Sequence, residues 1–113
     1  MSRDPRVDLE RIVACAERVI EYTAGLSFDA FVADPLRYDA TLRNLEIMGE
    51  AAKRVPDDLR ARFPTVPWRD LAGFRDRLAH GYDALDDRVI WDAVRRGVPA
   101  TLAAVRGALV ALG

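Results

Sequence analysis

The sequence predicts an all-α fold, an up-and-down helical bundle of four main helices joined by short helical segments. Apolar residues recur with helical spacing along the chain, no segment shows the sustained alternation of a strand, and Pro or Gly bounds the helical stretches. The chain has 113 residues, 50% of them hydrophobic, which is long enough for one compact core and too short for two. We therefore expect residues 1–113 to form one domain.

The first two long helices are marked by an Asp-Pro pair at their starts. Asp4 is a candidate N-cap with Pro5 at the first helical position, and Gly25 supplies the end of this helix. The same pair starts a second helix at Pro35, which should run as far as Pro56. Their apolar stripes are Leu9, Ile12, Val13, Ala16, Val19 and Ile20 in the first helix, and Leu42, Leu45, Met48, Ala52 and Val55 in the second.

Prolines then separate a short helical piece, DDLRARF, from a third main helix that runs through WRDLAGFRDRLAH. This helix should end at Gly81, because glycine adopts the left-handed conformation cheaply. Asp86 can cap a fourth helix, and Pro99 within it predicts a kink or a break. The apolar face of this fourth helix comprises Ile90, Val94, Val98, Leu102, Val105 and Leu109.

Composition limits the classes of protein that fit. The net charge of −1 gives no global argument for nucleic-acid binding, and the many arginines beside a single lysine, Lys53, are typical of a GC-rich genome. No apolar run approaches the ~18–20 residues that span a bilayer, and the N-terminus does not resemble a signal peptide. Cys15 has no second cysteine to pair with and fits a buried position. We expect a cytoplasmic protein without a membrane segment.

The stretch RDRLAHGY, residues 75–82, contains the only histidine of the chain, His80. Imidazole titrates near neutral pH and so can accept or donate a proton in the cell. Arg75 and Arg77 carry permanent charges whose fork geometry suits a phosphate group. These residue types suffice for RNA cleavage in which the neighbouring 2′-hydroxyl is the nucleophile, with no metal ion or cofactor.

Helix geometry qualifies this hypothesis. Five residues of ideal helix rotate by ~500°, so Arg75 and His80 would point about 140° apart on an unbroken helix. Because Gly81 ends the helix, the imidazole could turn toward the side of the arginine. The alternative is that His80 only caps the terminal carbonyl groups.

The single histidine also bears on oligomeric state. Cleavage by 2′-hydroxyl transfer is helped by both a base and an acid, whereas one chain supplies one imidazole. A symmetric homodimer would bring two RDRLAHGY segments into one groove. We therefore expect a homodimer.

Two further groups of residues are candidate sites. Arg43, Glu46 and Glu50 share one face of the second long helix, which could indicate a carboxylate metal site or an ion-paired face that orients the motif arginine. Trp68 and Trp91 are more typical of core or interface anchors than of base-stacking residues.

The chain as a whole resembles the HepT-like toxins of the HEPN superfamily, small helical ribonucleases encoded beside a minimal nucleotidyltransferase antitoxin. The resemblance runs from about Leu9 to Val98. The family signature R-x4-6-H falls on Arg75 and His80, and its H-x-Y extension falls on His80 and Tyr82. The segments that carry it are IEYTAGLSFDAFVAD, DATLRNLEIMGEAAKRVP, FPTVPWRDLAGFRDRLAHGY and DRVIWDAV.

The resemblance implies roles for these residues. Arg75 and His80 would be the catalytic pair of an endoribonuclease toxin, and Tyr82 would receive AMP from the partner nucleotidyltransferase. Asp76 stands where the family often has Asn, and it could pair with Arg77 and orient it, or repel RNA phosphate. The alternative function is a catalytically weak helical module that only binds the nucleotidyltransferase.

Overall fold

The structure, a computed structural model, describes residues 4–81 and 85–113, so Tyr82 lies outside the described residues. Within them the chain is helical between short turns and contains no strand. The all-α prediction is therefore confirmed. The elements are α1 (Pro5–Thr23), α2 (Phe28–Val32), α3 (Pro35–Arg54), α4 (Asp57–Arg62), α5 (Trp68–Ala79), α6 (Asp87–Asp92), the π-helical segment η2 (Ala93–Gly97) and α7 (Val98–Leu112).

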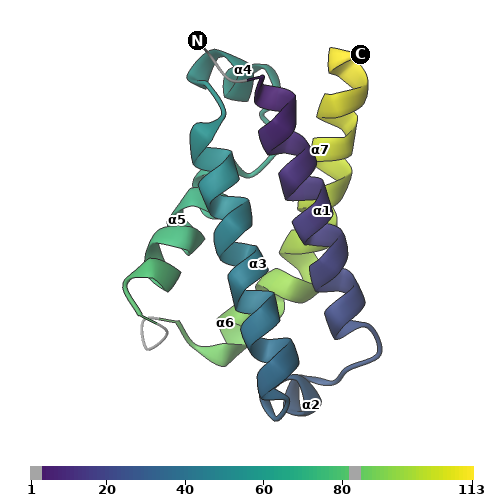
Figure 1. Cartoon of the computed structure of the whole chain (residues 1–113), viewed down its shortest axis with the longest axis vertical. Coiled ribbons are helices and arrows are strands. Elements are labelled where there is room, and N and C mark those ends of the chain that lie inside the picture. The colour runs from purple at the N-terminus through teal and green to yellow at the C-terminus, as the bar shows by residue number, and fades with distance from the viewer. Residues whose placement is uncertain (1–3, 82–84) are drawn as a thin grey trace.

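The main helices alternate in direction along the long axis of the molecule (Figure 1). Helix α1 descends to α2, α3 returns to α4, α5 descends again, and the run α6–η2–α7 ascends to the C-terminus. Helix α3 packs between α1 and α5, while α7 packs on α1. The arrangement confirms the predicted up-and-down bundle and leaves α5 with α3 as its main neighbour.

The starts of α1 and α3 follow the sequence signals. The side chain of Asp4 accepts a hydrogen bond from the backbone N–H of Arg6 at 3.0 Å, and that of Asp34 accepts one from Arg37 at 3.1 Å. Each cap satisfies a backbone donor that the helix itself leaves unpaired, and such a cap typically contributes about 1 kcal/mol. Gly25 follows α1 with a φ of 74°, as predicted for the residue that ends it.

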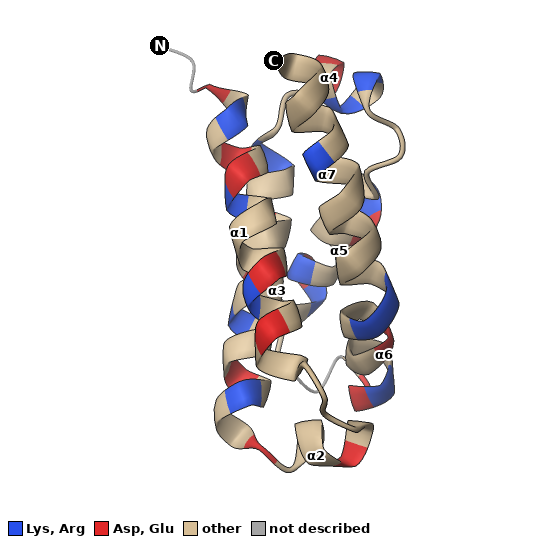
Figure 2. Ribbon diagram, turned by 90° about the vertical axis from the view of Figure 1, so that its right-hand side faces the viewer, with Lys and Arg blue, Asp and Glu red and all other residues tan. Residues whose placement is uncertain are grey.

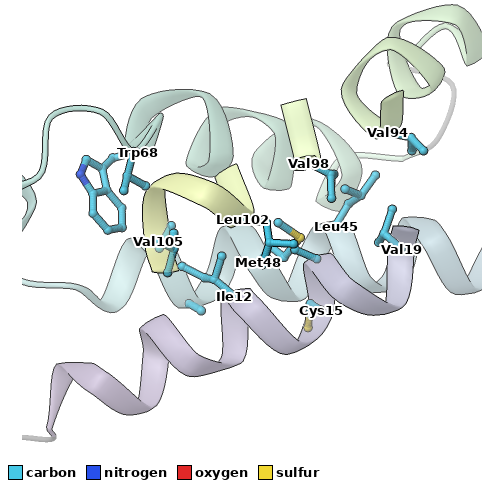
Figure 3. Close-up of a cluster of buried hydrophobic side chains, with 14 of the residues drawn as sticks. Ile12, Cys15, Val19, Leu45, Met48, Trp68, Val94, Val98, Leu102 and Val105 are labelled. Atoms are coloured by element: carbon cyan, nitrogen blue, oxygen red, sulfur yellow. The ribbon is translucent and has the colours of Figure 1, made fainter. Parts of the chain in front are cut away.

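The core lies between α1, α3, α5 and the last helical run (Figure 3). Trp68 is buried at the start of α5, and its indole N–H lies within hydrogen-bond distance of the carbonyl oxygens of Arg60 and Phe63. Trp91 packs its ring on Phe31 with centroids 5.0 Å apart. Both tryptophans are thus packing anchors. Cys15 is buried as predicted, and burial raises the pKa of its thiol.

The predicted interruption at Pro99 is a change of helical winding and not a break. The backbone N–H of Val98 donates to the carbonyl oxygen of Ala93, five residues earlier, which is the π-helical pattern. Proline has no N–H to donate, and its ring would clash with the carbonyl group of Arg95 in a regular α-helix. The wider turn directly before Pro99 therefore lets the helix continue as α7.

Charged residues of both signs are interspersed along α1 and α3, whereas α7 carries Arg106 as its one charged residue (Figure 2). No helix in the described residues combines the length and apolar character needed to cross a membrane.

Candidate active site

The candidate site is built on the last turn of α5. This helix ends at Ala79, His80 is its C-cap, and Gly81 follows with a φ of 114°. The N–H of His80 donates to the carbonyl oxygen of Asp76 at 3.2 Å, and that of Gly81 donates to Leu78 at 3.2 Å. The prediction that the helix ends at Gly81 is confirmed, and the imidazole lies at the exposed end of α5.

The ring of His80 is oriented by the backbone of its own helix. Its Nδ1 atom lies 2.6 Å from the carbonyl oxygen of Asp76. A carbonyl oxygen only accepts hydrogen bonds, so Nδ1 must carry the hydrogen. In the neutral ring this leaves the lone pair on Nε2, the nitrogen that can act as a base. The same contact is also the capping interaction that the sequence left as the alternative.

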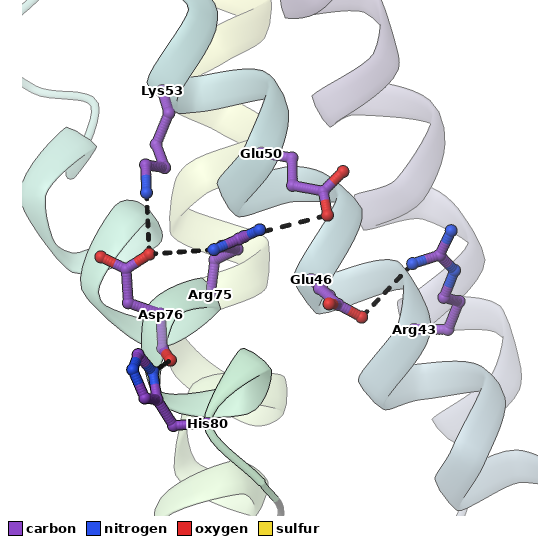
Figure 4. A network of polar contacts seen from close by, with 7 residues as sticks. All are labelled: Arg43, Glu46, Glu50, Lys53, Arg75, Asp76 and His80. Carbon is purple, nitrogen blue, oxygen red and sulfur yellow. Dashed lines mark hydrogen bonds and ion pairs between the residues drawn. The ribbon is translucent and has the colours of Figure 1, made fainter.

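The carboxylate of Asp76 joins α5 to α3 (Figure 4). One oxygen, Oδ1, lies 2.8 Å from Lys53 Nζ and 3.3 Å from the Nη1 atom of Arg75. The hydrogen bond from Lys53, followed by that from Arg75, lowers the pKa of Asp76, so this carboxyl group is charged at neutral pH. We call this contact the Lys53–Asp76–Arg75 bridge.

The bridge corrects one of the two possibilities that the sequence left open for Asp76. The pairing with Arg77 is not the one formed, since within residues 4–81 and 85–113 the ion pairs of Asp76 are with Lys53 and Arg75. This pairing depends on the packing of α5 against α3, because the side chain of Asp76 faces α3 and Lys53 extends from α3 toward it (Figure 4). Arg77 is exposed and lines a separate hollow with Phe74.

Arg75 is half-buried between α3 and α5, and its Nε lies 3.8 Å from Oε1 of Glu50. On the same face of α3, Arg43 and Glu46 form an ion pair at 3.3 Å. Among the described residues no three side chains of the metal-ligating types gather closely enough to hold a metal ion. Of the two alternatives for this face, the structure therefore shows the ion-paired one, with Glu50 contacting the motif arginine.

Gly49 sets the distance between the two helices that carry the site. A Cβ atom at this position would overlap the Cβ of Arg75 and would lie 2.6 Å from the carbonyl oxygen of Leu71. Only the absence of a side chain lets α5 approach α3 this closely, since a backbone oxygen cannot move aside as a flexible side chain can. Gly49 thus places Arg75 against α3.

Two surface hollows border the bridge. One has a volume of about 360 Å³, and the other, between α4 and α5, has a volume of about 700 Å³. Asp76 lines the larger hollow, whereas its partners Lys53 and Arg75 line the smaller one, so the bridge lies between them. The smaller hollow is completed by Glu50 and Arg54, and the larger by Asp57, Arg60, Ala61, Pro64, Trp68, Arg69, Ala72 and Gly73.

Asp76 is the residue that connects the two members of the predicted pair. Its side chain binds Arg75 and its carbonyl oxygen binds His80, while the guanidinium group and the imidazole extend in different directions from α5 (Figure 4). Sequence analysis missed Gly49 and Lys53. A glycine inside a long helix costs stability and is itself a signal of close approach, whereas nothing in the spacing singles out Lys53.

Comparison with known proteins supports the resemblance. The chain matches the family described as ribonuclease HepT-like over residues 12–107. It is 41% identical to "Putative RNase TTE0752" of Caldanaerobacter subterraneus subsp. tengcongensis over 97 residues, which cover 86% of this chain and 87% of that protein. It is 38% identical to "Probable ribonuclease HepT" of Thermococcus cleftensis over 100 residues, covering 88% and 91% of the two chains. No solved structure gives a significant match. Since the family match covers most of the helices that build the candidate site, this chain belongs to the HepT-like ribonuclease family.

Proposed function

We propose that this protein is the toxin of a two-gene system, a metal-independent endoribonuclease whose catalytic residues are Arg75 and His80. The observation that carries the proposal is the double contact of Asp76, which in the free protein binds Arg75 through its carboxylate and His80 through its carbonyl oxygen. The contact with the carbonyl oxygen leaves Nε2 of His80 available for proton transfer, five residues after a guanidinium group suited to phosphate.

The proposed reaction uses the RNA itself as the nucleophile. Nε2 of one His80 removes the proton of a 2′-hydroxyl, O2′ forms a bond to the adjacent phosphorus, and the bond from phosphorus to O5′ breaks. The departing O5′ takes a proton from a second, protonated His80. Arg75 stabilises the extra negative charge on the phosphoryl oxygens in the transition state. The products are a 2′,3′-cyclic phosphate and a free 5′-hydroxyl.

The second histidine in this scheme comes from a second copy of the chain, because each chain contains one. A symmetric homodimer that brings the ends of two α5 helices together would supply a base and an acid to one groove. The position of His80 at the exposed end of α5 supports this arrangement, since its ring is not enclosed by its own bundle.

Cleavage should persist in EDTA and should leave a 2′,3′-cyclic phosphate and a 5′-hydroxyl, because the nucleophile belongs to the RNA. A matched oligonucleotide that lacks the 2′-hydroxyl at the cleaved position should stay intact. End-group analysis of the products by mass spectrometry is the measurement. A 5′-phosphate end would rule out this reaction and indicate attack by water, as in metal-dependent nucleases.

We further propose that a partner nucleotidyltransferase of the minimal family neutralises the toxin by adenylylating Tyr82. The tyrosine oxygen would attack the α-phosphorus of ATP, lose its proton and displace pyrophosphate. Tyr82 is two residues beyond His80 in the chain, so the added phosphate would compete with RNA phosphate for Arg75 and His80.

Incubation with the nucleotidyltransferase encoded beside this gene, Mg²⁺ and ATP should therefore add AMP to Tyr82. Peptide mass spectrometry locates the added mass, and growth of cells that express both proteins measures neutralisation. Tyr82→Phe should stay unmodified and toxic. If the Phe variant is still fully neutralised, the partner acts by binding alone, which would favour the alternative of a module that mainly binds the nucleotidyltransferase.

A further inference from the structure

We propose that Lys53 and Arg75 form a two-cation subsite for an RNA phosphodiester, and that the carboxylate of Asp76 occupies this subsite in the free protein. The inference rests on the proposed function and adds Lys53, from α3, as an RNA-binding residue. In this proposal Asp76 weakens RNA binding, because its carboxylate would compete with the RNA phosphate for the two cations.

In the bridge, two cationic side chains contact one carboxylate oxygen, as they would contact an oxygen atom of a bound anion. Lys53 Nζ and the Nη1 atom of Arg75 lie within reach of the same atom, Oδ1 of Asp76, at 2.8 and 3.3 Å. A non-bridging phosphate oxygen has the same charge and the same capacity to accept hydrogen bonds, so two cations that converge on a carboxylate oxygen can also hold a phosphate oxygen. The sequence places these cations on two helices, and Gly49 brings the helices together.

The occupied subsite can be opened at low cost. The side chains of Lys53 and Asp76 are 44% and 48% exposed, and ion pairs this open to water contribute little to stability. The hollow of about 360 Å³ beside Lys53 and Arg75 gives a ligand access to both cations. Glu50 also lines this hollow, and its Oε1 atom lies 3.8 Å from the Nε of Arg75, so Glu50 would still contact the guanidinium group when Asp76 moves away.

The proposal predicts that substitutions of Asp76 and Lys53 change RNA affinity in opposite directions. Binding is measured by fluorescence anisotropy with the full chain and a short labelled RNA whose 2′-hydroxyls are replaced by fluorine, so that it cannot be cleaved. Asp76→Asn should bind this RNA roughly 3- to 10-fold more tightly, and Lys53→Gln roughly 3- to 10-fold more weakly. Lys53→Gln should also lower the slope of log affinity against log salt by about 0.7, the value for one lost contact to a single strand.

The ion pair between Arg106 and Glu17, at 2.9 Å on α7 and α1, provides matched controls. Arg106→Gln and Glu17→Gln change the net charge by the same amounts as the two bridge variants, and both should leave RNA affinity and the salt slope unchanged. A purely structural bridge would instead make Asp76→Asn and Lys53→Gln behave alike, since each variant breaks the same contact. That result, or the absence of binding by all variants including Asp76→Asn, would overturn the proposal.

Cleavage assays on the same variants separate this inference from the proposed function. If the wild-type protein cleaves RNA but Lys53→Gln changes neither binding nor cleavage, the subsite is wrong and the nuclease stands. If binding follows the predicted pattern and no variant cleaves RNA, the subsite stands and the catalytic proposal is wrong.

Discussion

His80→Ala and Arg75→Ala should each abolish toxicity and lower the rate of RNA cleavage by roughly 10²- to 10⁴-fold, the usual cost of losing a catalytic acid or base or a group that stabilises charge in the transition state. His80 is proposed to transfer the proton and Arg75 to stabilise the phosphoryl charge. Single-turnover cleavage of a labelled RNA and growth after expression without the partner gene are the measurements. Growth arrest by a folded His80→Ala protein at the wild-type level would exclude this mechanism.

A second substitution separates catalysis from capping at the end of α5. His80→Asn keeps a side-chain N–H that can donate to the carbonyl oxygen of Asp76, and Asn is tolerated at a helix C-terminus, but its amide does not titrate near neutral pH. If His80 only caps the helix, this variant should retain activity. If His80 transfers protons, the variant should be as inactive as His80→Ala while showing the same circular dichroism as the wild-type protein.

Mixed dimers extend the same prediction to the oligomeric state. If the base and the acid come from two copies of His80, a dimer with one wild-type and one His80→Ala subunit lacks one of them. Mixing and refolding the two proteins should then lower activity more steeply than the fraction of wild-type subunits. A linear dependence would contradict a site shared between two copies.

Gly49→Ala should lower the free energy of unfolding by about 1–3 kcal/mol, the typical effect of an extra methyl group in a packed interface. Elsewhere in a helix the same change is favourable by about 1 kcal/mol, because alanine restricts the unfolded chain and favours the helical conformation. Here the new Cβ would overlap the Cβ of Arg75 and press on the backbone of Leu71, so α5 has to move away from α3. Urea denaturation followed by circular dichroism measures the change.

Gly107→Ala is the matched control for this substitution. Gly107 lies inside α7, and apart from its chain neighbours and the backbone of its own helix a Cβ atom there would have no atom within 4 Å. This variant should be slightly more stable than the wild-type protein and should cleave RNA normally. Equal stabilisation by both alanines would mean that α3 and α5 are not in the close contact that holds Arg75.

The features that the sequence predicted well are local ones. Asp4 with Pro5 and His80 with Gly81 mark helix ends because their signals act within one turn of backbone. The sequence suggested Arg77 as a possible partner of Asp76 and did not indicate Lys53, because Lys53 is 23 residues away and meets Asp76 only where α3 packs against α5. The contact between these two helices depends on how they pack in the folded chain, and the sequence of either helix alone does not predict it. The pairing of Glu50 with Arg75 was anticipated in outline, because helical spacing places Glu50 on a defined face of α3.

The π-helical segment Ala93–Gly97 has a consequence for comparing this chain with its relatives. A π turn accommodates one more residue than an α turn over the same rise of the helix, and it behaves as a single inserted residue. The apolar positions Ile90, Val94 and Val98 are spaced by four residues, a step that drifts around a regular α-helix, and all three are nevertheless buried. An alignment with a relative whose last helix is α-helical throughout must therefore open a gap of one position within 93–97. Without that gap, each residue of α7 would be compared with a position that lies about 100° away around the counterpart helix.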